Sequence, residues 1–364
     1  MSGSKDLHRP DRAIFARPDA HSPRAILPTH TTLGRKGAPV FRWGIISTGR
    51  IANDFAVGVS QLPDATVLAV GSRTQQAADA FGDRHSAERR YDSYEALAAD
   101  PDLDAIYVAT PHPFHAPNCI TCLEAGVAVL CEKPFTINAA ELEQVVNLAR
   151  EKGLFLMEGM WSRFMPATRK LRELLASGVI GDINIVDIDF GFRAPFNPQH
   201  RLFAPELGGG ALLDIGIYSL SFASMVLGKP QRVLSMAHLG ESGVDENAAI
   251  ILGYESGALT TINTAIRTTT PHQAVINGTL GRITMHPQYW FPQRITLEVY
   301  GRETSVMEIP MNGNGFNHEA AEVARCVRNG QLESEIMPLD ESLELMRTMD
   351  ELRGQWGLRY PMED

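Results

Sequence analysis

The sequence predicts an α/β protein: an N-terminal Rossmann-type, doubly wound parallel sheet, then a C-terminal α/β domain with a large, open, mostly antiparallel sheet. Three observations lead to this prediction. Strand-like and helix-like segments alternate from Phe41 to about residue 160, which is typical of βαβ units. Beyond that point several strand-like segments follow one another with short turns, as in antiparallel sheets. The 364 residues also exceed one ordinary domain.

In the first half, short apolar runs predict buried strands and the segments between them predict helices. The clearest helix, 138–153, has Leu142, Val145, Val146 and Ala149 at positions i, i+3, i+4 and i+7, so they share one face. The predicted strands are 41–47, 66–72, 103–110, 127–132 and 154–158, and the predicted helices are 50–62, 74–85, 94–101, 115–126 and 138–153.

The second half begins with a predicted helix at 167–178, and a glycine-rich turn leads into the apolar helix 210–228. Its predicted strands are 182–192, 232–240, 246–255, 258–266, 272–278, 282–287, 294–301 and 305–310, and two helices, 317–330 and 339–357, end the chain. We therefore expect a nucleotide-binding domain at 41–160 and a substrate-binding and oligomerisation domain at 161–364.

Residues 1–40 stand apart from both domains. They contain five prolines and show no periodic apolar face, which predicts an extended, proline-rich arm that is ordered only where it docks. A flexible tail is the alternative.

Composition excludes several classes of protein. With 33 basic and 43 acidic residues, the net charge of −10 lacks the positive footprint that nucleic acids and anionic membranes require. No uninterrupted apolar run approaches the roughly 18 residues of a membrane span. Four cysteines do not make a disulfide framework, so we expect a reducing, cytoplasmic location. Cys119 and Cys122 lie inside a helical segment with no second ligand pair, so we expect no metal site there.

A phosphate-binding turn is predicted between the first strand and the first helix. The dinucleotide fingerprint G-x-G-x-x-G/A keeps its second glycine and closing alanine here, whereas serine replaces its first glycine. A helix that starts at such a turn directs free N–H groups at a pyrophosphate. The residues of this turn are Ser47, Thr48, Gly49, Arg50, Ile51 and Ala52.

The end of the second strand indicates which dinucleotide binds. An Asp or Glu there usually holds the free ribose 2′-hydroxyl of NAD. This chain has Ser72 and Arg73 instead, and a guanidinium with a hydroxyl suits a 2′-phosphate. The predicted cofactor is therefore NADP.

Polar residues end two neighbouring strands at the edge of the sheet where ligands bind. Thr110, Pro111 and His112 follow one strand, with His115 close behind, and Glu132, Lys133 and Pro134 follow the next. These segments, A-T-P-H-P-F-H and C-E-K-P, together with S-T-G-R-I-A at 47–52 and G-G-G-A-L-L-D-I-G-I-Y at 208–218, resemble the Gfo/Idh/MocA oxidoreductases over about residues 41–360. They are similar to the branch with glucose–fructose oxidoreductase, aldose dehydrogenases and dimeric dihydrodiol dehydrogenase.

The resemblance implies an oligomer, a homodimer or homotetramer, formed through the C-terminal sheet, and a cis Lys133–Pro134 peptide. It also implies that Trp161 and Arg163 approach the cofactor, that His112 and His115 line its site, and that Glu132 supports the fold or the cofactor.

The catalytic hypothesis joins Lys133 to Asp214 and Tyr218, which stand four residues apart on one helical face. A phenol with a reference pKa of about 10 is a poor base near neutrality. We expect the Lys133 ammonium and the oxidised nicotinamide to lower that pKa. Tyr218 would then exchange a proton with the substrate hydroxyl, Lys133 would polarise that oxygen, and Asp214 would orient the hydroxyl.

The expected reaction is hydride transfer between NADP and a small-molecule sugar, with aldopyranose C1 oxidised to a lactone as the first choice. In a tightly bound form, the same NADP would oxidise one sugar and reduce another. A trans-dihydrodiol is the alternative substrate, because Arg193, Asn197 and Arg201 suit a sugar whereas Phe192, Phe196 and Phe203 suit a flatter ring. A non-catalytic NADP-sensing protein is the rival from another class.

Overall fold

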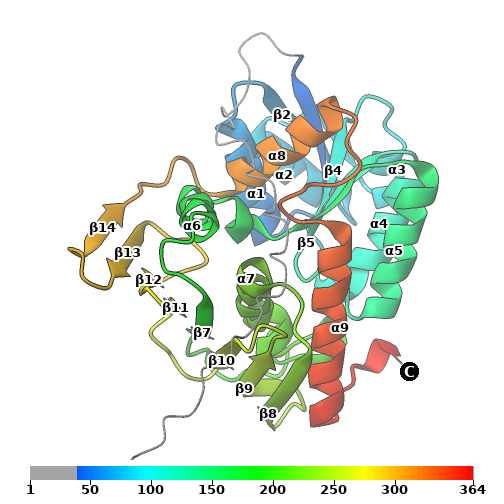
Figure 1. The fold of residues 1–364 in the computed structure, drawn as a ribbon. Coiled ribbons are helices and arrows are strands. Elements are labelled where there is room, and N and C mark those ends of the chain that lie inside the picture. The colour runs from blue at the N-terminus through cyan, green and yellow to red at the C-terminus, as the bar shows by residue number, and fades with distance from the viewer. Residues whose placement is uncertain (1–38, 364) are drawn as a thin grey trace, which may run out of the picture.

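The computed structural model describes residues 39–363, which fold around two sheets (Figure 1). The predicted proline-rich arm, 1–40, lies almost wholly outside the described residues. The order of helices and strands follows the α/β prediction, and that prediction is confirmed.

The N-terminal sheet has six parallel strands in the order β3-β2-β1-β4-β5-β6. The chain runs outward from β1 to β3 and then crosses back to β4, so the carboxyl ends of β1 and β4 flank the topological switch point at which ligands bind in such sheets. The strands are β1 (Phe41–Ile46), β2 (Ala65–Gly71), β3 (Arg89–Tyr91), β4 (Ala105–Val108), β5 (Ala128–Glu132) and β6 (Leu156–Gly159). The helices are α1 (Arg50–Ser60), α2 (Gln75–His85), α3 (Tyr94–Ala98), η1 (His112–Phe114), α4 (His115–Glu124) and α5 (Ala139–Lys152).

Helices cover both faces of this sheet, and β4, β5 and β6 are buried along their whole length. That burial explains why these strands are continuous apolar runs in the sequence. β3 is not predicted from the sequence, because it is three residues long and carries two arginines.

The second sheet has eight strands in the order β14-β13-β12-β11-β7-β10-β9-β8. Only the β7–β10 pair is parallel, so the predicted mostly antiparallel sheet is confirmed. The strands are β7 (Ile183–Gly191), β8 (Arg232–Leu239), β9 (Asp245–Gly253), β10 (Leu259–Ala265), β11 (Ala274–Gly278), β12 (Gly281–Met285), β13 (Arg294–Val299) and β14 (Ser305–Glu308). The helices are η2 (Trp161–Phe164), α6 (Pro166–Ala176), η3 (Pro205–Leu207), η4 (Leu212–Gly216), α7 (Ile217–Leu227), α8 (Phe316–Arg328), α9 (Leu339–Trp356) and η5 (Pro361–Glu363).

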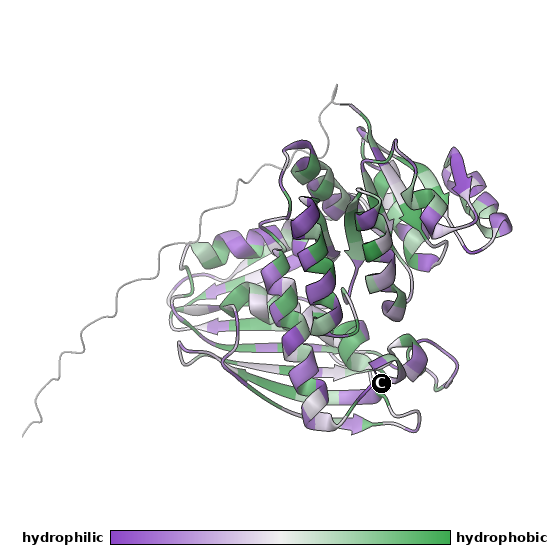
Figure 2. Ribbon diagram, turned by 90° about the vertical axis from the view of Figure 1, so that its right-hand side faces the viewer, coloured by the Kyte–Doolittle hydropathy of each residue, from purple (hydrophilic) through white to green (hydrophobic). Residues whose placement is uncertain are grey.

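Among residues 39–363, helices cover one face of the larger sheet. Helices α6, α7 and α9 contact the face that looks toward the N-terminal sheet (Figure 1). Along β7, β8, β9 and β10, exposed residues alternate with buried ones, so the exposed residues lie on the other face of the sheet. Several of these exposed residues are apolar. Hydrophobic colour runs along these strands in Figure 2, whereas the helices alternate between hydrophobic and hydrophilic residues. The large exposed apolar residues on these strands are Ile185, Leu234, Met236, Ile251 and Leu259.

The segment Pro205–Leu227 is long and apolar enough to cross a membrane, with a mean hydropathy of 1.6. Yet 83% of its most apolar window is buried inside the protein, as in a core helix. It contains both η4 and α7, which position the central groups of the site described below.

The chain returns to the first sheet near its end. Helix α8 packs on α1, where Phe316 meets Phe55 edge-on with ring centroids 6.5 Å apart. Arg328 on α8 forms an ion pair with Asp64, N to O 2.6 Å. Segments from both sides of the predicted domain boundary, at residues 160 and 161, therefore pack against each other. The boundary itself stays a prediction.

Candidate active site

The turn between β1 and α1 leaves backbone donors open. Gly49 is the N-cap of α1, is exposed, and makes no side-chain cap. Among the described residues, a Cβ added at Gly49 would meet only Ser47 Oγ, at 3.5 Å, so residues 39–363 leave the backbone of this turn accessible. Thr48 and Ile51 are half-buried beside it and Arg50 is exposed. Free N–H groups at the positive end of a helix suit a pyrophosphate.

Ser47 keeps the backbone shape that the missing glycine would have. Its φ is +93°, a value that glycine adopts far more readily than serine. Its Oγ accepts the N–H of Gly49 at 3.2 Å, and its own N–H donates to Gly71 O at 3.0 Å. Serine in place of the first glycine of the fingerprint therefore leaves the backbone shape of the turn unchanged.

The carboxyl end of β2 presents a cation. Ser72 is buried and its N–H donates to Tyr91 O at 3.0 Å, whereas Arg73 is exposed and forms no ion pair within residues 39–363. No acid stands at positions 71–74, where NAD enzymes usually carry one.

The loops after β4 and β5 are tied together by histidine. The two ring nitrogens of His115 lie 2.7 Å from Thr110 O and 2.8 Å from Pro134 O, and its burial lowers its pKa. His112 lies 3.2 Å, through Nδ1, from Gly208 O, and burial lowers its pKa to about 3. Both histidines thus brace the loops, and Pro111, which precedes them, is exposed.

Lys133 lies where the two sheets meet. The Lys133–Pro134 peptide is cis, as the resemblance implied. The Nζ atom of Lys133 donates to the backbone oxygen of Asp214 at 2.7 Å and lies 3.9 Å from Asp214 Oδ1. The same Nζ lies 4.7 Å from the ring centroid of Tyr218. An amine and a phenol from distant segments therefore converge.

Asp214 sits in a wider turn than predicted. The sequence predicts one helix over 210–228, but Leu212–Gly216 forms a π-helical turn and α7 begins only at Ile217. Buried Asp245 accepts the N–H of Leu212 at 2.7 Å at the start of this turn. Asp214 Oδ1 then accepts Arg201 Nη1 at 2.7 Å. Such turns are frequent at functional sites because they redirect side chains.

Burial and charge set the protonation of this cluster. Burial lowers the pKa of the Lys133 amine, although Asp214 and Glu132 oppose the shift. Burial alone would raise the pKa of Asp214, but Lys133 and Arg201 outweigh it, so that pKa is lowered.

The pKa of Tyr218 differs from expectation. Burial raises it well above its usual value, the charge of Glu132 adds to the rise, and the hydrogen bond from Trp161 opposes it. In the ligand-free chain Tyr218 is therefore a neutral phenol.

Aromatic rings surround the phenol. Trp161 Nε1 donates to Tyr218 OH at 2.6 Å, and the Trp161 ring stacks on Phe316 with centroids 4.9 Å apart. On another side Phe190 lies 5.8 Å from the Tyr218 ring and stacks on Trp290 at 3.5 Å. Flat apolar surfaces thus face one polar cluster, an arrangement that suits a ring with hydroxyl groups.

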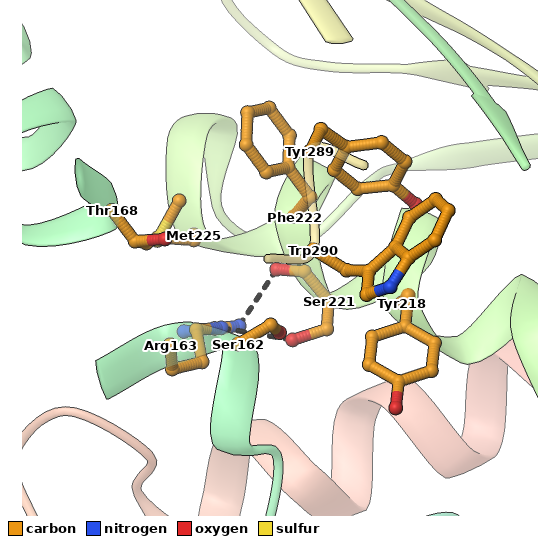
Figure 3. Close-up of a pocket in the computed structure, with 9 residues that line it drawn as sticks. All are labelled: Ser162, Arg163, Thr168, Tyr218, Ser221, Phe222, Met225, Tyr289 and Trp290. Atoms are coloured by element: carbon orange, nitrogen blue, oxygen red, sulfur yellow. Dashed lines mark hydrogen bonds between the residues drawn. The ribbon is translucent and has the colours of Figure 1, made fainter. Parts of the chain in front are cut away.

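Arg163 and Glu132 have partners inside the protein. Arg163 is buried, and its guanidinium donates to Ser221 and, at 2.7 Å, to Glu341 Oε1. Figure 3 shows Arg163 directed at Ser221 around a cavity of about 10 Å³, with the Tyr218 hydroxyl pointing away from it. Glu132 accepts the Tyr107 hydroxyl and, at 3.2 Å, the Lys133 N–H, and its burial raises its pKa. A direct role of either residue at the cofactor stays a prediction.

Sequence reasoning missed Trp290 and Phe316, and it treated the 190–203 loop as the pocket. Within that loop Phe190 and Arg201 contact the cluster, whereas Phe196 and Phe203 pack edge-on against each other with Arg267 over both rings. The aromatic run at 289–291, in a loop between strands, was the available signal.

A nicotinamide dinucleotide fits these residues. The turn at Gly49 would hold the pyrophosphate, Arg73 would bind a ribose phosphate, and Lys133 and Tyr218 would supply polar groups to the reacting ring. Glu319, whose two carboxyl oxygens have no partner within the described residues, is a further buried group without an internal counterpart.

This fold and site define a class of protein, an oxidoreductase with an NAD(P)-binding Rossmann domain. Residues 41–160 match the family described as "Oxidoreductase family, NAD-binding Rossmann fold", and 168–284 match the "GFO/IDH/MocA C-terminal domain". The chain belongs to the Gfo/Idh/MocA family of oxidoreductases, as its motifs had indicated.

Individual relatives have narrower names. The chain is 41% identical over 332 residues to trans-1,2-dihydrobenzene-1,2-diol dehydrogenase of Xenopus laevis, which covers 88% of this chain and 99% of that one. It is 38% identical over 334 residues to the enzyme of the same name from Mus musculus, covering 88% and 98%. A 3-ketoreductase from Actinomadura kijaniata, solved with NADP and TDP-benzene, has a TM-score of 0.78 at 26% identity, covering 87% and 98%. An aldose–aldose oxidoreductase from Caulobacter crescentus, at 24% identity and a TM-score of 0.79, covers 86% and 97% and shares the fold.

Proposed function

We propose that this protein is an NADP-dependent dehydrogenase that oxidises one hydroxyl-bearing carbon of a cyclic trans-1,2-diol. The observation that carries the proposal is the convergence of Lys133 and Tyr218 beneath aromatic rings. The names of relatives at 37–41% identity support the diol. We therefore prefer the dihydrodiol, the alternative in the sequence analysis, to the aldose.

Bound NADP supplies the hydride acceptor, and the chain supplies proton handling and orientation. Lys133, with its lowered pKa, is better placed than Tyr218 to lose a proton in the ligand-free chain. We assign Tyr218 to hydrogen-bond the reacting oxygen and Lys133 to stabilise negative charge that develops on it. Asp214, held by Lys133 and Arg201, orients the same hydroxyl or its neighbour.

The choice of NADP rests on Arg73. An exposed guanidinium at the end of β2, with no acid beside it, offers a phosphate two parallel hydrogen bonds. The 3-ketoreductase relative was solved with NADP, which supports the same choice.

An aldopyranose is the second candidate substrate. The charged side of the pocket, with Asp214 bonded to Arg201, can recognise several hydroxyl groups, and flat aromatic faces also pack on sugar rings.

We also propose that the open face of the eight-stranded sheet forms a homodimer or homotetramer. Exposed apolar residues rarely gather in one patch on a monomer, yet five lie on adjacent strands β7 to β10. Sedimentation of the purified chain tests this, and a monomer at micromolar concentration would contradict it.

A substrate panel tests the proposed reaction. The purified chain is assayed for NADP reduction at 340 nm with a trans-dihydrodiol, its cis isomer, and a set of stereoisomeric aldoses. We expect the highest kcat/KM with the trans-diol. A higher kcat/KM for an aldose would replace the diol by the sugar. Tight NADP binding without oxidation of any compound would indicate the non-catalytic rival.

A further inference from the structure

Glu319 is a buried acid with no partner in the described part of the chain. It lies in the first turn of α8, its side chain is fully buried, and neither carboxyl oxygen receives a hydrogen bond within residues 39–363. Glu322, one turn further along, is also buried but is bonded by Arg325 and Ser334. An ionised carboxylate without partners is strongly unfavourable in an apolar interior. Glu319 is therefore a neutral acid in the ligand-free chain.

Two aromatic contacts connect this acid to the catalytic cluster. Phe316, three residues earlier and on the same side of α8, stacks on Trp161, whose indole donates to Tyr218 OH. Phe316 also meets Phe55 edge-on, and Phe55 stacks at 3.8 Å on Tyr107, which donates to Glu132. Glu319 thus lies one helical turn from the ring that joins both groups.

The titratable groups whose charge is coupled to that of Glu319 come from three elements. Tyr107 lies on β4, Glu132 ends β5 and Tyr218 lies on α7. Burial raises the pKa of Glu319 well above its usual value and the charge of Glu132 adds to the rise. Glu319 in turn contributes to the raised pKa values of Tyr107 and Tyr218. These acids therefore respond to one another's charge, and the same response is expected to any charge added to the site.

We propose that Glu319 compensates the charge of the nicotinamide: it keeps its proton in the ligand-free chain and with the reduced cofactor, and releases it when the oxidised cofactor binds. The inference rests on the proposed function, because it requires a nicotinamide in this site. Oxidised and reduced forms differ by one positive charge on the ring, and a nearby cation favours an ionised carboxylate.

Ionised Glu319 also closes the proton balance of the reaction. Oxidation of an alcohol removes a hydride from carbon and a proton from oxygen. Bound NADP would supply the acceptor for the hydride, which cancels the positive charge of the ring. Glu319 would then regain one proton, which matches in number the proton lost by the substrate oxygen. The buried site then has the same net charge before and after the reaction, and no proton has to leave the protein in that step.

Proton release on cofactor binding tests the inference without turnover. NADP⁺ and NADPH are titrated into the full-length chain by calorimetry at one pH in phosphate and in Tris, whose ionisation enthalpies differ, so that bound or released protons are counted. For the unaltered chain we expect NADP⁺ to release more protons than NADPH, with a difference approaching one per site. Glu319→Gln should bind both nucleotides and lose that difference, whereas Glu322→Gln should retain it.

Several results would overturn the inference. Equal proton release by the two nucleotides in the unaltered chain would do so, as would a difference that persists in Glu319→Gln. If Glu319→Gln does not fold, the infrared carbonyl band of protonated carboxyl groups in the unaltered chain decides: it should lose intensity with NADP⁺ and keep it with NADPH, and equal bands would contradict the assignment. Failure of both nucleotides to bind would overturn the proposed function and this inference together.

Discussion

The phosphate turn and the catalytic cluster are built on different principles. At the turn, Ser47 and Gly49 are neighbours in sequence, partly or fully exposed, and their backbone shape forms the site. In the cluster, Lys133 comes from a segment distant from Asp214 and Tyr218, and all three are mostly buried and depend on one another's charge. Backbone shape tolerates a changed side chain, whereas a buried charge balance does not. Substitutions should therefore have large effects in the cluster and small ones at the turn.

The largest effect is expected for Lys133→Met. This change removes the cation beside Asp214 and Tyr218, so negative charge on the reacting oxygen loses its cationic stabilisation and keeps only the hydrogen bond from Tyr218. We predict a fall in kcat on the order of 10³-fold, while NADPH affinity changes only a few-fold. Steady-state turnover and fluorescence titration with NADPH measure the two quantities. A kcat within tenfold of the unaltered enzyme would show that the cluster is not the reaction centre.

Tyr218→Phe separates the phenol from the amine. We predict that kcat falls by about 10²-fold, because the hydroxyl that meets the reacting oxygen is lost. Tyr289→Phe is the matched control, since the Tyr289 hydroxyl lies 2.8 Å from Oγ of Ser219, the residue that follows Tyr218 on α7. The control should keep its kcat and lose about 1 kcal/mol of unfolding free energy in urea. Near-full turnover by Tyr218→Phe would show that the Tyr218 hydroxyl does not meet the reacting oxygen.

Arg73→Ala tests the one place where a side chain, not the backbone, should matter at the cofactor end. Loss of a charge-assisted pair to a phosphate predicts a rise of roughly 10- to 100-fold in the KM for NADPH. The KM for NADH should stay the same, which provides the control within the same protein. Equal changes for both cofactors would remove Arg73 from recognition of the 2′-phosphate.

A buried acid, Glu158, also predicts that the stability of the protein depends on pH. Glu158 at the end of β6 is buried, and its burial raises its pKa to about 7. The unfolded value is near 4.5, so the contribution of Glu158 to stability is fully present below about pH 4.5 and is lost as pH rises through about 7. Between pH 5 and 8 the unfolding free energy should therefore fall by about 2 kcal/mol more than in Glu158→Gln. The prediction would be contradicted if the unfolding free energies of the two proteins, measured in urea, fell by the same amount between pH 5 and 8.

The smallest effect is expected for Ser47→Gly. Glycine relieves the positive φ of this residue but loses more conformational entropy on folding, so we predict a gain of about 0.5 kcal/mol. Affinity for NADPH should change less than twofold, as measured by titration. A large loss of affinity would mean that the Ser47 hydroxyl, and not the turn alone, binds phosphate.

Much of the fold was predictable because each signal for it is local. The strands of the first sheet are apolar runs, helix α5 has its full apolar face, and the motifs around Gly49 and Lys133 stand at strand ends. The resemblance added Tyr218 and Asp214, which the structure places beside Lys133.

The remainder depends on contacts that no local pattern encodes. The π-helical turn around Asp214 is accompanied by a bond from distant Asp245, and the raised pKa of Tyr218 results from burial that sequence spacing does not reveal. Trp290 and Glu319 reach the site only because the chain folds back across both sheets.

The stacking of Trp161 on Phe316 has a consequence for biosynthesis. The stack joins residue 161 to residue 316, so a ribosome must have synthesised the chain through α8 before this contact can form. Premature termination anywhere upstream of α8 should leave a nascent product that lacks the pocket, however well its first sheet has formed.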